Sequence, residues 1–332
     1  MISVEVSKEP DSNWNKQLLG SKYGTVYQTV EYAQYVESRI KSTPNYIKFM
    51  TPSGDIVGQL LVFQSFKGNR KLKKYVGNGF LYSVSSKISS ILPKYSYWNF
   101  GPVISNSDLT EEIFDTLGNV LASWKGKFVG SVHPLNSDFN FPTKFNFQRQ
   151  NNGTFLINLS QNLNEILDAT DKKSVKKNIE RSEERNVHVT EISSKGDLAI
   201  YHELLNTHRQ YNQLDSYNMD DILEGHQTLS SVGQKGFLAW LDNVPIGGIF
   251  FSSFNKYINE WGIARSKMDT ERKLYSIDLL RWKIIEWGKK NNCSYYDLSG
   301  IKTENRDSKE EGIFRNKEKW GGKLVVYPSF SN

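Results

Sequence analysis

Hydrophobic and polar positions alternate along three consecutive segments in the second half of the chain. Phe237–Leu241, Pro245–Phe254 and Tyr257–Ala264 each have the two-residue period and the β-branched or aromatic content of strands. Short polar dipeptides, Asp242-Asn243 and Asn255-Lys256, separate them. Because Asn and Asp adopt tight turns readily, the pattern predicts an antiparallel meander.

The spacing of apolar residues then changes to three and four, which predicts a helix over about Glu271–Lys289. A short strand, Cys293–Leu298, follows this helix. One face of the helix carries a stripe that we expect to be buried: Ile277, Leu280, Ile284 and Trp287.

The first half repeats this order of elements more loosely. It contains a hairpin, Tyr46–Met50 with Ile56–Phe66, a strand Tyr97–Ile104, a helix Leu109–Trp124 and a strand Phe128–Val132. The repeat lies in the order of elements, since no residue-level repeat is present. Antiparallel strands that feed one helix and one further strand predict a mixed α/β (α+β) fold with mainly antiparallel sheets, rather than a doubly wound sheet.

Other segments connect or complete these two halves. Residues 136–152, rich in Asn and Phe, predict a linker or long loop, and Thr154–Leu159 predicts a short strand. Helices are expected over Leu163–Asn186 and Asp197–Asn212, and a last strand over Lys323–Tyr327.

Length and composition narrow the class of protein. A chain of 332 residues suggests two domains. No run of eighteen apolar residues and no secretion signal is evident, so we expect no membrane span and a cytoplasmic location. The single cysteine, Cys293, excludes an intrachain disulfide and a cysteine-based metal centre. The five histidines lack metal-ligand spacing, so no metal site is predicted.

The net charge of +6 comes from the first half, where residues 1–155 hold 17 basic and 11 acidic side chains. The excess is concentrated between Lys67 and Lys74. Within this cluster, Lys71 and Lys73 are candidates for binding a phosphate of the substrate, and a solvated surface loop is the alternative interpretation.

Several short motifs follow one another along the chain. The two most specific are Tyr296–Gly300 (YDLSG) and Gly312–Gly322 (GIFRNKEKWGG). The others, in chain order, are GTVYQTVEY at 24–32, NFGP at 99–102, VHPL at 132–135, the basic segment 172–186 followed by VHV, THR at 207–209 and PIGG at 245–248.

The order of these motifs resembles that of the FemABX family of peptidoglycan-bridge aminoacyltransferases. This resemblance implies two tandem GNAT-like (acyl-CoA N-acyltransferase-like) domains. The first, over 1–152 and 321–332, would bind the acceptor, and the second, over 153–320, would bind the donor and carry catalysis. The implied reaction adds an amino acid from aminoacyl-tRNA to a peptidoglycan-precursor-like or amino-sugar acceptor. It needs no separate cofactor, and the family is compatible with a monomer. Asn316 stands where the family usually has Phe, and His133 where Asp is common, which bears on the acceptor.

The chemistry of amide formation leaves the donor open. It requires positioning and stabilisation of an oxyanion, and no Cys–His or Ser–His motif is present. Acetyl-CoA enzymes of this fold usually bind pyrophosphate at a glycine-rich turn before the central helix. The corresponding stretch, residues 265–273, has no glycine and carries Met268, Asp269 and Glu271. This argues against CoA.

A tRNA donor would need a basic surface, and the segment 172–185 offers one. Its four leading lysines are the candidates for contact with RNA phosphates, whereas Val175 and Ile179 would anchor the segment to the core. The alternative is an ordinary solvated face. The candidate phosphate contacts are Lys172, Lys173, Lys176 and Lys177.

Five residues are candidates for the reaction itself. The resemblance places Lys317 near the acyl ester, where an ammonium would stabilise developing negative charge. Asp297 would accept a proton or orient Lys317, and Arg209 would clamp a carboxylate or phosphate. Tyr257 and Trp261 would line a substrate groove. The alternatives are a surface lysine, a loop-capping Asp297, an ion-paired Arg209 and two core aromatic residues.

Two other functions remain compatible with the sequence. One keeps the fold but uses acyl-CoA as an N-acyltransferase of polysaccharide biosynthesis. The other is a non-catalytic module that binds a nucleotide-sugar or RNA.

Overall fold

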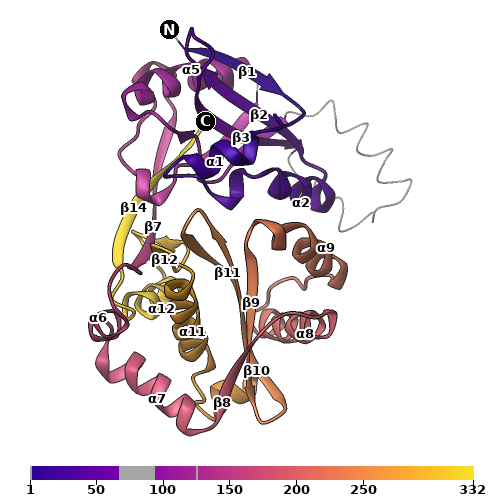
Figure 1. The fold of residues 1–332 in the computed structure, drawn as a ribbon, viewed down its shortest axis with the longest axis vertical. Coiled ribbons are helices and arrows are strands. Elements are labelled where there is room, and N and C mark those ends of the chain that lie inside the picture. The colour runs from indigo at the N-terminus through magenta and orange to yellow at the C-terminus, as the bar shows by residue number, and fades with distance from the viewer. Residues whose placement is uncertain (1, 67–93, 125) are drawn as a thin grey trace. The chain divides into compact units, whose positions relative to one another are not determined.

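The computed structural model describes residues 2–66, 94–124 and 126–332 (Figure 1). The chain divides into two compact units. Unit 1 comprises Met1–Asn152 and Val326–Asn332, and unit 2 comprises Gly153–Val325. The last residues of the chain therefore return to the unit that the first residues began.

Unit 1 is built on a sheet in the order β1-β2-β3-β4-β6-β14, with β5 beside β3. Neighbouring strands are antiparallel, except for the parallel pair β4 and β6. The strands are β1 (Ser3–Ser7), β2 (Thr43–Met50), β3 (Ile56–Phe66), β4 (Lys94–Trp98), β5 (Val103–Ile104), β6 (Lys127–Ser131) and β14 (Lys323–Ser331). The helices are α1 (Trp14–Gly20), α2 (Val30–Ile40) and α5 (Thr110–Ser123).

Phenylalanines dominate the core of unit 1. Phe114 of α5 packs edge-to-face on Phe141, with ring centroids 5.0 Å apart, and Phe141 packs in the same way on Phe330 at 4.9 Å. Phe147 meets Phe128 of β6 at 4.7 Å. Phe141 and Phe147 belong to the segment predicted as a linker or long loop. The segment is a long loop as far as Phe147, but it is not a free linker, because its aromatic side chains pack in the core of unit 1.

The predicted strand Tyr97–Ile104 is also interrupted. β4 ends at Trp98, Phe100 adopts a positive φ of 51°, and the chain resumes as β5 at Val103. The buried Gln28 side chain secures this bend. Its amide nitrogen donates to the Asn99 carbonyl at 2.7 Å, and its amide oxygen accepts from the Leu61 N–H of β3 at 2.6 Å. The glutamine of the GTVYQ motif therefore connects the bend with the sheet.

The strands of unit 2 follow one another in the order β7-β12-β11-β10-β9-β8, with β13 beside β7. In the described part of this order β11 and β12 run parallel, whereas β7–β12, β11–β10, β10–β9 and β9–β8 are antiparallel. The strands are β7 (Gln148–Asn158), β8 (Val187–Glu191), β9 (Gln234–Leu241), β10 (Val244–Phe254), β11 (Tyr257–Arg265), β12 (Tyr295–Asp297) and β13 (Ile301–Lys302).

The meander predicted from the alternating pattern is confirmed. Leu241 pairs with Val244 across Asp242-Asn243, and Phe254 pairs with Tyr257 across Asn255-Lys256. Asn255 and Lys256 both have positive φ, 50° and 63°. That backbone matches the right-handed twist of two-residue hairpins.

Helices cover both faces of the sheet of unit 2 (Figure 1). A core cluster with α11 packs on one face, and α8 and α9 pack on the other. The helices are α6 (Leu163–Ala169), a π-helical turn (Lys172–Lys176), α7 (Lys177–Glu184), α8 (Lys195–Tyr211), α9 (Met219–Leu229), α10 (Lys267–Glu271), α11 (Ser276–Lys290) and α12 (Ser308–Glu318).

The glycines of the PIGG motif allow helices to approach β10 closely from both sides. A Cβ on Gly247 would lie 2.5 Å from the hydroxyl of Ser276 in α11. A Cβ on Gly248 would lie 2.8 Å from the ring of Tyr201 in α8. Both distances are shorter than packed atoms tolerate, so these positions favour glycine for steric reasons.

Two predicted helices have different bounds in the structure. The helix expected from Glu271 begins at Ser276 instead, because Tyr275 has a positive φ of 58° and separates α10 from α11. The helix expected over Leu163–Asn186 is broken at Thr170, whose backbone is extended. Asp171 then accepts backbone hydrogen bonds from Lys173 and Ser174 and starts the π-helical turn.

The mixed α+β class with mainly antiparallel strands is confirmed in both units. Within the described parts of the chain, no helix is both long and apolar enough to cross a membrane.

Candidate active site

Asp297, the last residue of β12, lies at the centre of a buried polar cluster in unit 2. Its side chain is fully buried. Tyr257 and Asn259, two residues apart on β11, donate to the same carboxylate oxygen at 2.6 and 3.1 Å. The other oxygen accepts from the Ser299 N–H at 2.7 Å and from the Thr154 hydroxyl. Burial raises the pKa of Asp297, and these hydrogen bonds oppose the rise.

Lys317, on α12, reaches back to the turn that follows β12. Its ammonium donates to the carbonyl oxygens of Ser299 and Gly300, each at 3.0 Å. Ser299 has a positive φ of 64°, and its N–H bonds to the Asp297 carboxylate. One turn thus connects Asp297 with Lys317. An ammonium has three N–H donors, and these two contacts leave one directed to neither carbonyl.

The pKa of Lys317 is lowered, and burial is the largest cause. Arg281 lowers it further, whereas the negative charges of Glu260 and Asp297 act in the opposite direction. The lysine is half-buried, so its charge lies close to the low-dielectric interior, where electrostatic effects on a bound group are stronger than in water.

Beneath Lys317, a buried ion pair joins β11 to α11. Arg281 donates to both oxygens of Glu260, at 2.9 and 3.0 Å, and Tyr296 donates to Glu260 at 2.7 Å. The two charged side chains are 1% and 4% exposed. Burial alone would raise the pKa of Glu260, yet the adjacent Arg281 lowers it, so the carboxylate stays ionised.

Sequence reasoning missed this pair. Its signal is an unbroken polar dipeptide, Asn259-Glu260, in the middle of an otherwise apolar strand, together with Arg281 beside Leu280 of the buried helix stripe. Thr154 was missed as well, because a threonine within a strand carries no distinctive pattern.

The structure brings Lys317, Asp297 and Tyr257 into this one cluster and places the other two candidates apart from it. Trp261 is the extra residue of a bulge between β10 and β11 and packs with the aromatic cluster of Tyr201. Arg209 lies near the end of α8. Its Nε donates to the Asp215 carbonyl, and its guanidinium lies 4.5 Å from the centroid of the Tyr217 ring. Arg209 therefore holds the loop after α8.

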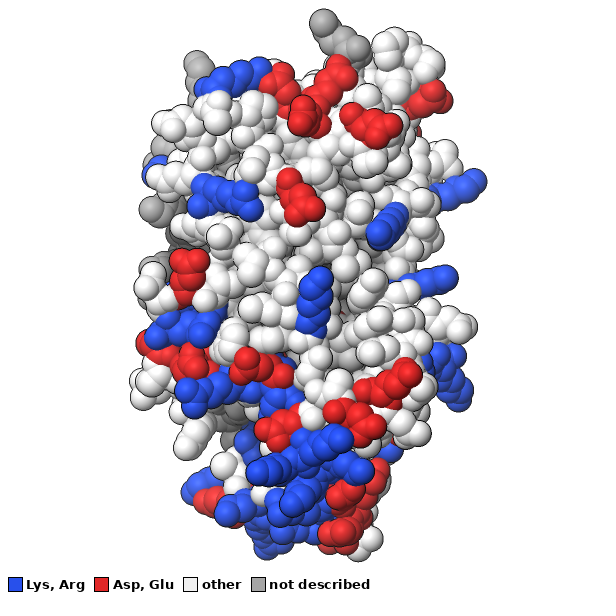
Figure 2. All heavy atoms as spheres, turned by 90° about the vertical axis from the view of Figure 1, so that its left-hand side faces the viewer, with Lys and Arg blue, Asp and Glu red and all other residues white. Residues whose placement is uncertain are grey.

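The four candidate lysines of the basic segment are all exposed on the π-helical turn and the start of α7. Buried Val175 and Ile179 anchor the segment, as the sequence predicted. Figure 2 shows Lys and Arg side chains, with Asp and Glu among them, gathering toward the end of unit 2 where α7 lies. Lys71 and Lys73 lie outside the described residues.

The N-terminus of α11 is occupied by a side chain of the protein itself. The fully buried Asp269 accepts from the Ser276 N–H at 2.8 Å, and Arg265 donates to its second carboxylate oxygen. A helix N-terminus attracts anions because its N–H groups lack intrahelical partners. Here the chain's own carboxylate satisfies that end of the central helix.

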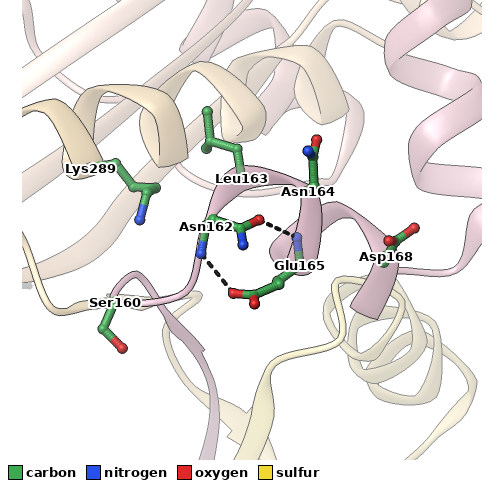
Figure 3. A pocket seen from close by; sticks show the side chains of 7 residues that line it. All are labelled: Ser160, Asn162, Leu163, Asn164, Glu165, Asp168 and Lys289. Carbon is green, nitrogen blue, oxygen red and sulfur yellow. Dashed lines mark hydrogen bonds between the residues drawn. The ribbon is translucent and has the colours of Figure 1, made fainter.

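A hollow of about 600 Å³ lies beside the start of α6 (Figure 3). Several polar groups that line it already have partners within the chain. Asn162 and Glu165 form a reciprocal capping box, Lys289 donates to the carbonyl oxygens of Leu159 and Gln161, and Asp168 pairs with Lys172 at 3.4 Å. Across the described part of the chain, no group of three His, Cys, Asp or Glu side chains is arranged to hold a metal ion.

Solved structures share this fold at low sequence identity. FemX matches with a TM-score of 0.74 and 11% identity, over 98% of this chain and 96% of that chain. L-PGS from Bacillus licheniformis matches with a TM-score of 0.58 and 10% identity, over 98% and 93%. A tandem GNAT protein from the clavulanic acid biosynthesis pathway matches with a TM-score of 0.51 and 9% identity, over 99% and 97%. No family model and no curated protein matches the chain.

These likenesses cover almost the whole length of the chain, so they concern both units. The fold is that of a tandem GNAT protein. More narrowly it is FemABX-like, as the motifs predicted. At these sequence identities the similarity establishes the fold, and the reaction has to be argued from the residues of the site.

Proposed function

We propose that this protein is an acyltransferase that forms an amide, moving an amino acid from aminoacyl-tRNA to an amine on a cell-wall or glycan precursor. One observation carries the proposal. In a FemABX-like fold, the Lys317 ammonium donates hydrogen bonds to two carbonyl oxygens next to a buried carboxylate, Asp297. These contacts fix its position, whereas a surface lysine would move freely in water. A lysine held in this way is preorganised to meet developing negative charge.

The reaction requires few groups. The acceptor nitrogen attacks the ester carbonyl carbon, an N–C bond forms, and the carbonyl oxygen becomes an oxyanion. Lys317 would donate its remaining N–H to that oxygen. When the C–O bond breaks, the ribose hydroxyl leaves with a proton, and the acceptor nitrogen loses one. No covalent enzyme intermediate is needed.

Asp297 fits an orienting role better than a proton-accepting role. Four donors already engage its two oxygens, and one of them is the N–H of Ser299, whose carbonyl holds Lys317. Tyr257 would act through the same carboxylate. In this proposal Asp297 keeps the turn in place, and the turn keeps the ammonium in place.

The occupied end of α11 supports tRNA over acyl-CoA as the donor. A CoA pyrophosphate that docked at this helix N-terminus would meet the carboxylate of Asp269, which already accepts the Ser276 N–H. Two anions at one helix end repel each other. The exposed lysines of the basic segment instead offer a surface for RNA phosphates.

The remaining parts of the proposal follow from the family resemblance. Unit 1 would bind the acceptor, with Lys71 and Lys73 contacting its phosphate, and unit 2 would bind the donor. The enzyme would work in the cytoplasm, where charged tRNA is present.

A variant of Lys317 tests the proposed chemistry. Removing one donor to an oxyanion typically lowers kcat by about 10²–10³-fold, and we expect Lys317→Ala to lose transfer to that extent with an unchanged melting temperature. Lys309→Ala is the matched control, because Lys309 is exposed on the same helix. The measurement is single-turnover transfer from aminoacyl-tRNA to an amino-sugar peptide acceptor. Equal transfer rates for Lys317→Ala and Lys309→Ala would contradict the proposed catalytic role of Lys317.

The donor is tested by a parallel binding titration of acetyl-CoA and a stably aminoacylated acceptor-stem RNA. We expect salt-sensitive binding of the RNA and no saturable binding of CoA. Tight CoA binding without RNA preference would instead support an acyl-CoA N-acyltransferase. Binding of RNA without any transfer would support the non-catalytic module.

A further inference from the structure

Two residues next to each other on α12 connect to the buried interior in different ways. Lys317 reaches the turn after β12, and Asn316, although exposed, reaches Arg281. The amide oxygen of Asn316 accepts from Nη1 of Arg281 at 2.8 Å. Nε and Nη2 of the same guanidinium donate to Glu260. The buried ion pair therefore extends to the residue immediately before Lys317.

The same pair also contacts the turn that holds the lysine. The Ser299 hydroxyl donates to the backbone carbonyl of Glu260, and the Ser299 carbonyl accepts from Lys317. Both ends of the Lys317 side chain are thus connected by hydrogen bonds to the Glu260–Arg281 pair. Its backbone is held through Asn316, and its ammonium is held through the turn.

A further contact shows that α12 docks on α11 at more than one point. Lys319 pairs with the buried Asp278 at 2.8 Å, and Asn178 donates to the same carboxylate at 2.7 Å. Removing Asn316 therefore leaves a second attachment of α12 in place. Loss of the Asn316 contact should change the orientation of Lys317 without releasing the helix.

We infer that Asn316 is a positioning residue for the proposed transfer, through which the buried Arg281–Glu260 pair fixes where the Lys317 ammonium lies. The expected effect on the transfer rate rests on the proposed function. The expected effect on the position of Lys317 does not. A buried guanidinium can hold a neighbour with little freedom, since its planar fork is rigid. A misplacement of about 1 Å at a reacting group costs on the order of a hundredfold in rate.

The test compares Asn316→Leu, which removes the acceptor, with Asn316→Asp, which retains an acceptor oxygen. Arg315→Leu is the control, because Arg315 is exposed on the same helix and its guanidinium pairs with Glu311. The first readout is an NMR pH titration of ¹³C-methylated lysines in the full chain, with the Lys317 signal assigned by Lys317→Arg.

Charged groups face Lys317 from three elements: Glu260 on β11, Arg281 on α11 and Asp297 on β12. Burial is the largest cause of its lowered pKa, so a lysine released toward water should titrate at higher pH. We expect this upward change in Asn316→Leu and the wild-type value in Arg315→Leu. Asn316→Asp is compared by its transfer rate alone, because its added negative charge would itself raise the pKa of Lys317. The NMR readout needs no turnover.

The second readout is steady-state transfer. We expect Asn316→Leu to lower kcat about tenfold or more with little change in KM, and Asn316→Asp to restore most of the rate. If Asn316→Leu matches Arg315→Leu in both readouts, the inference is wrong. If Lys317→Ala leaves transfer unchanged while Asn316→Leu still moves the Lys317 titration, the positioning holds and the proposed function fails.

Discussion

The interiors of the two units differ in the kind of polar group that they bury. In the described residues of unit 1, the buried polar side chains are neutral amides, hydroxyls and one imidazole, with Gln28 and His133 among them. Unit 2 buries Glu260, Asp269 and Arg281, together with Asp278 and Asp297. Both sheets have a comparable apolar core, so folding alone does not explain this difference.

Burial of a charge is costly unless the charge is paired and hydrogen-bonded, and a hydrophobic pair of similar volume is often at least as stable. A core that contains several charged groups is therefore typical of a functional site, where their electric field acts on a bound or reacting group. The ionised interior lies around β11, β12 and α11, directly beneath Lys317. Unit 2 is thus the unit in which we propose that the transfer takes place.

The largest expected effect comes from breaking the buried pair of unit 2. Arg281→Met should lower the free energy of unfolding of this unit by about 3–5 kcal/mol, because it leaves Glu260 buried without its partner. The measurement is calorimetry with the transitions of the two units resolved. Glu260→Leu combined with Arg281→Met should recover most of the loss.

The control is Lys283→Met on the same helix, whose pair with Glu183 is partly exposed and should contribute less than about 1 kcal/mol. Equal losses for Arg281→Met and Lys283→Met would mean that the interior of unit 2 does not depend on ionised groups.

A smaller effect should appear in unit 1 and depend on pH. Burial lowers the pKa of His133 to about 3, against 6.5 in a solvated chain. The unfolded state therefore binds a proton first, and stability falls as the pH drops below about 6.5. At pH 5 this amounts to about 2 kcal/mol.

His133→Asn removes the titration and keeps an acceptor for the Leu135 N–H, which His133 Nδ1 accepts at 3.1 Å. Unfolding of unit 1, followed by urea denaturation at pH 7 and pH 5, should then lose less stability in the variant than in the wild type. An identical loss in both proteins would place the acid sensitivity elsewhere.

The smallest effect on stability is expected at the surface of unit 2. Lys172→Ala with Lys176→Ala should change the free energy of unfolding by less than about 0.5 kcal/mol, because both side chains are exposed. The same change should weaken RNA binding and make its salt dependence shallower by about 1–2 in logarithmic slope. Lys195→Ala, at the start of the neighbouring helix α8, is a single-lysine control. Unaltered RNA binding would mean that this segment is an ordinary solvated surface and does not contact the RNA.

Much of the fold could be predicted because its signals are local. The meander turns at Asn255-Lys256 and the apolar stripe of α11 depend on residues close in sequence. The errors have non-local causes. The phenylalanines of the supposed linker are ordered by α5 and β14, and Tyr275 ends the continuity of a helix through a backbone angle that no periodicity reveals. Short or edge elements such as β1 and α9 gave no clear pattern.

The candidate site divides in the same way. Lys317 and Asp297 lie in short motifs with strong family likeness, so each was visible from sequence. Their connection through the Ser299 turn was not, because it joins the ends of β12 and α12. Arg281 was hidden because a lone arginine in a helix is ordinarily solvated. Only three-dimensional packing shows that it is buried.

The return of β14 to unit 1 has a consequence for the order of synthesis. Ser329 pairs with Ser131 of β6, and the ribosome makes these two residues with all of unit 2 between them. The sheet of unit 1 therefore remains incomplete while unit 2 emerges and folds. A nascent chain would keep the edge of β6 open until translation passes β14. Truncation before Ser329 would therefore damage the unit that was translated first.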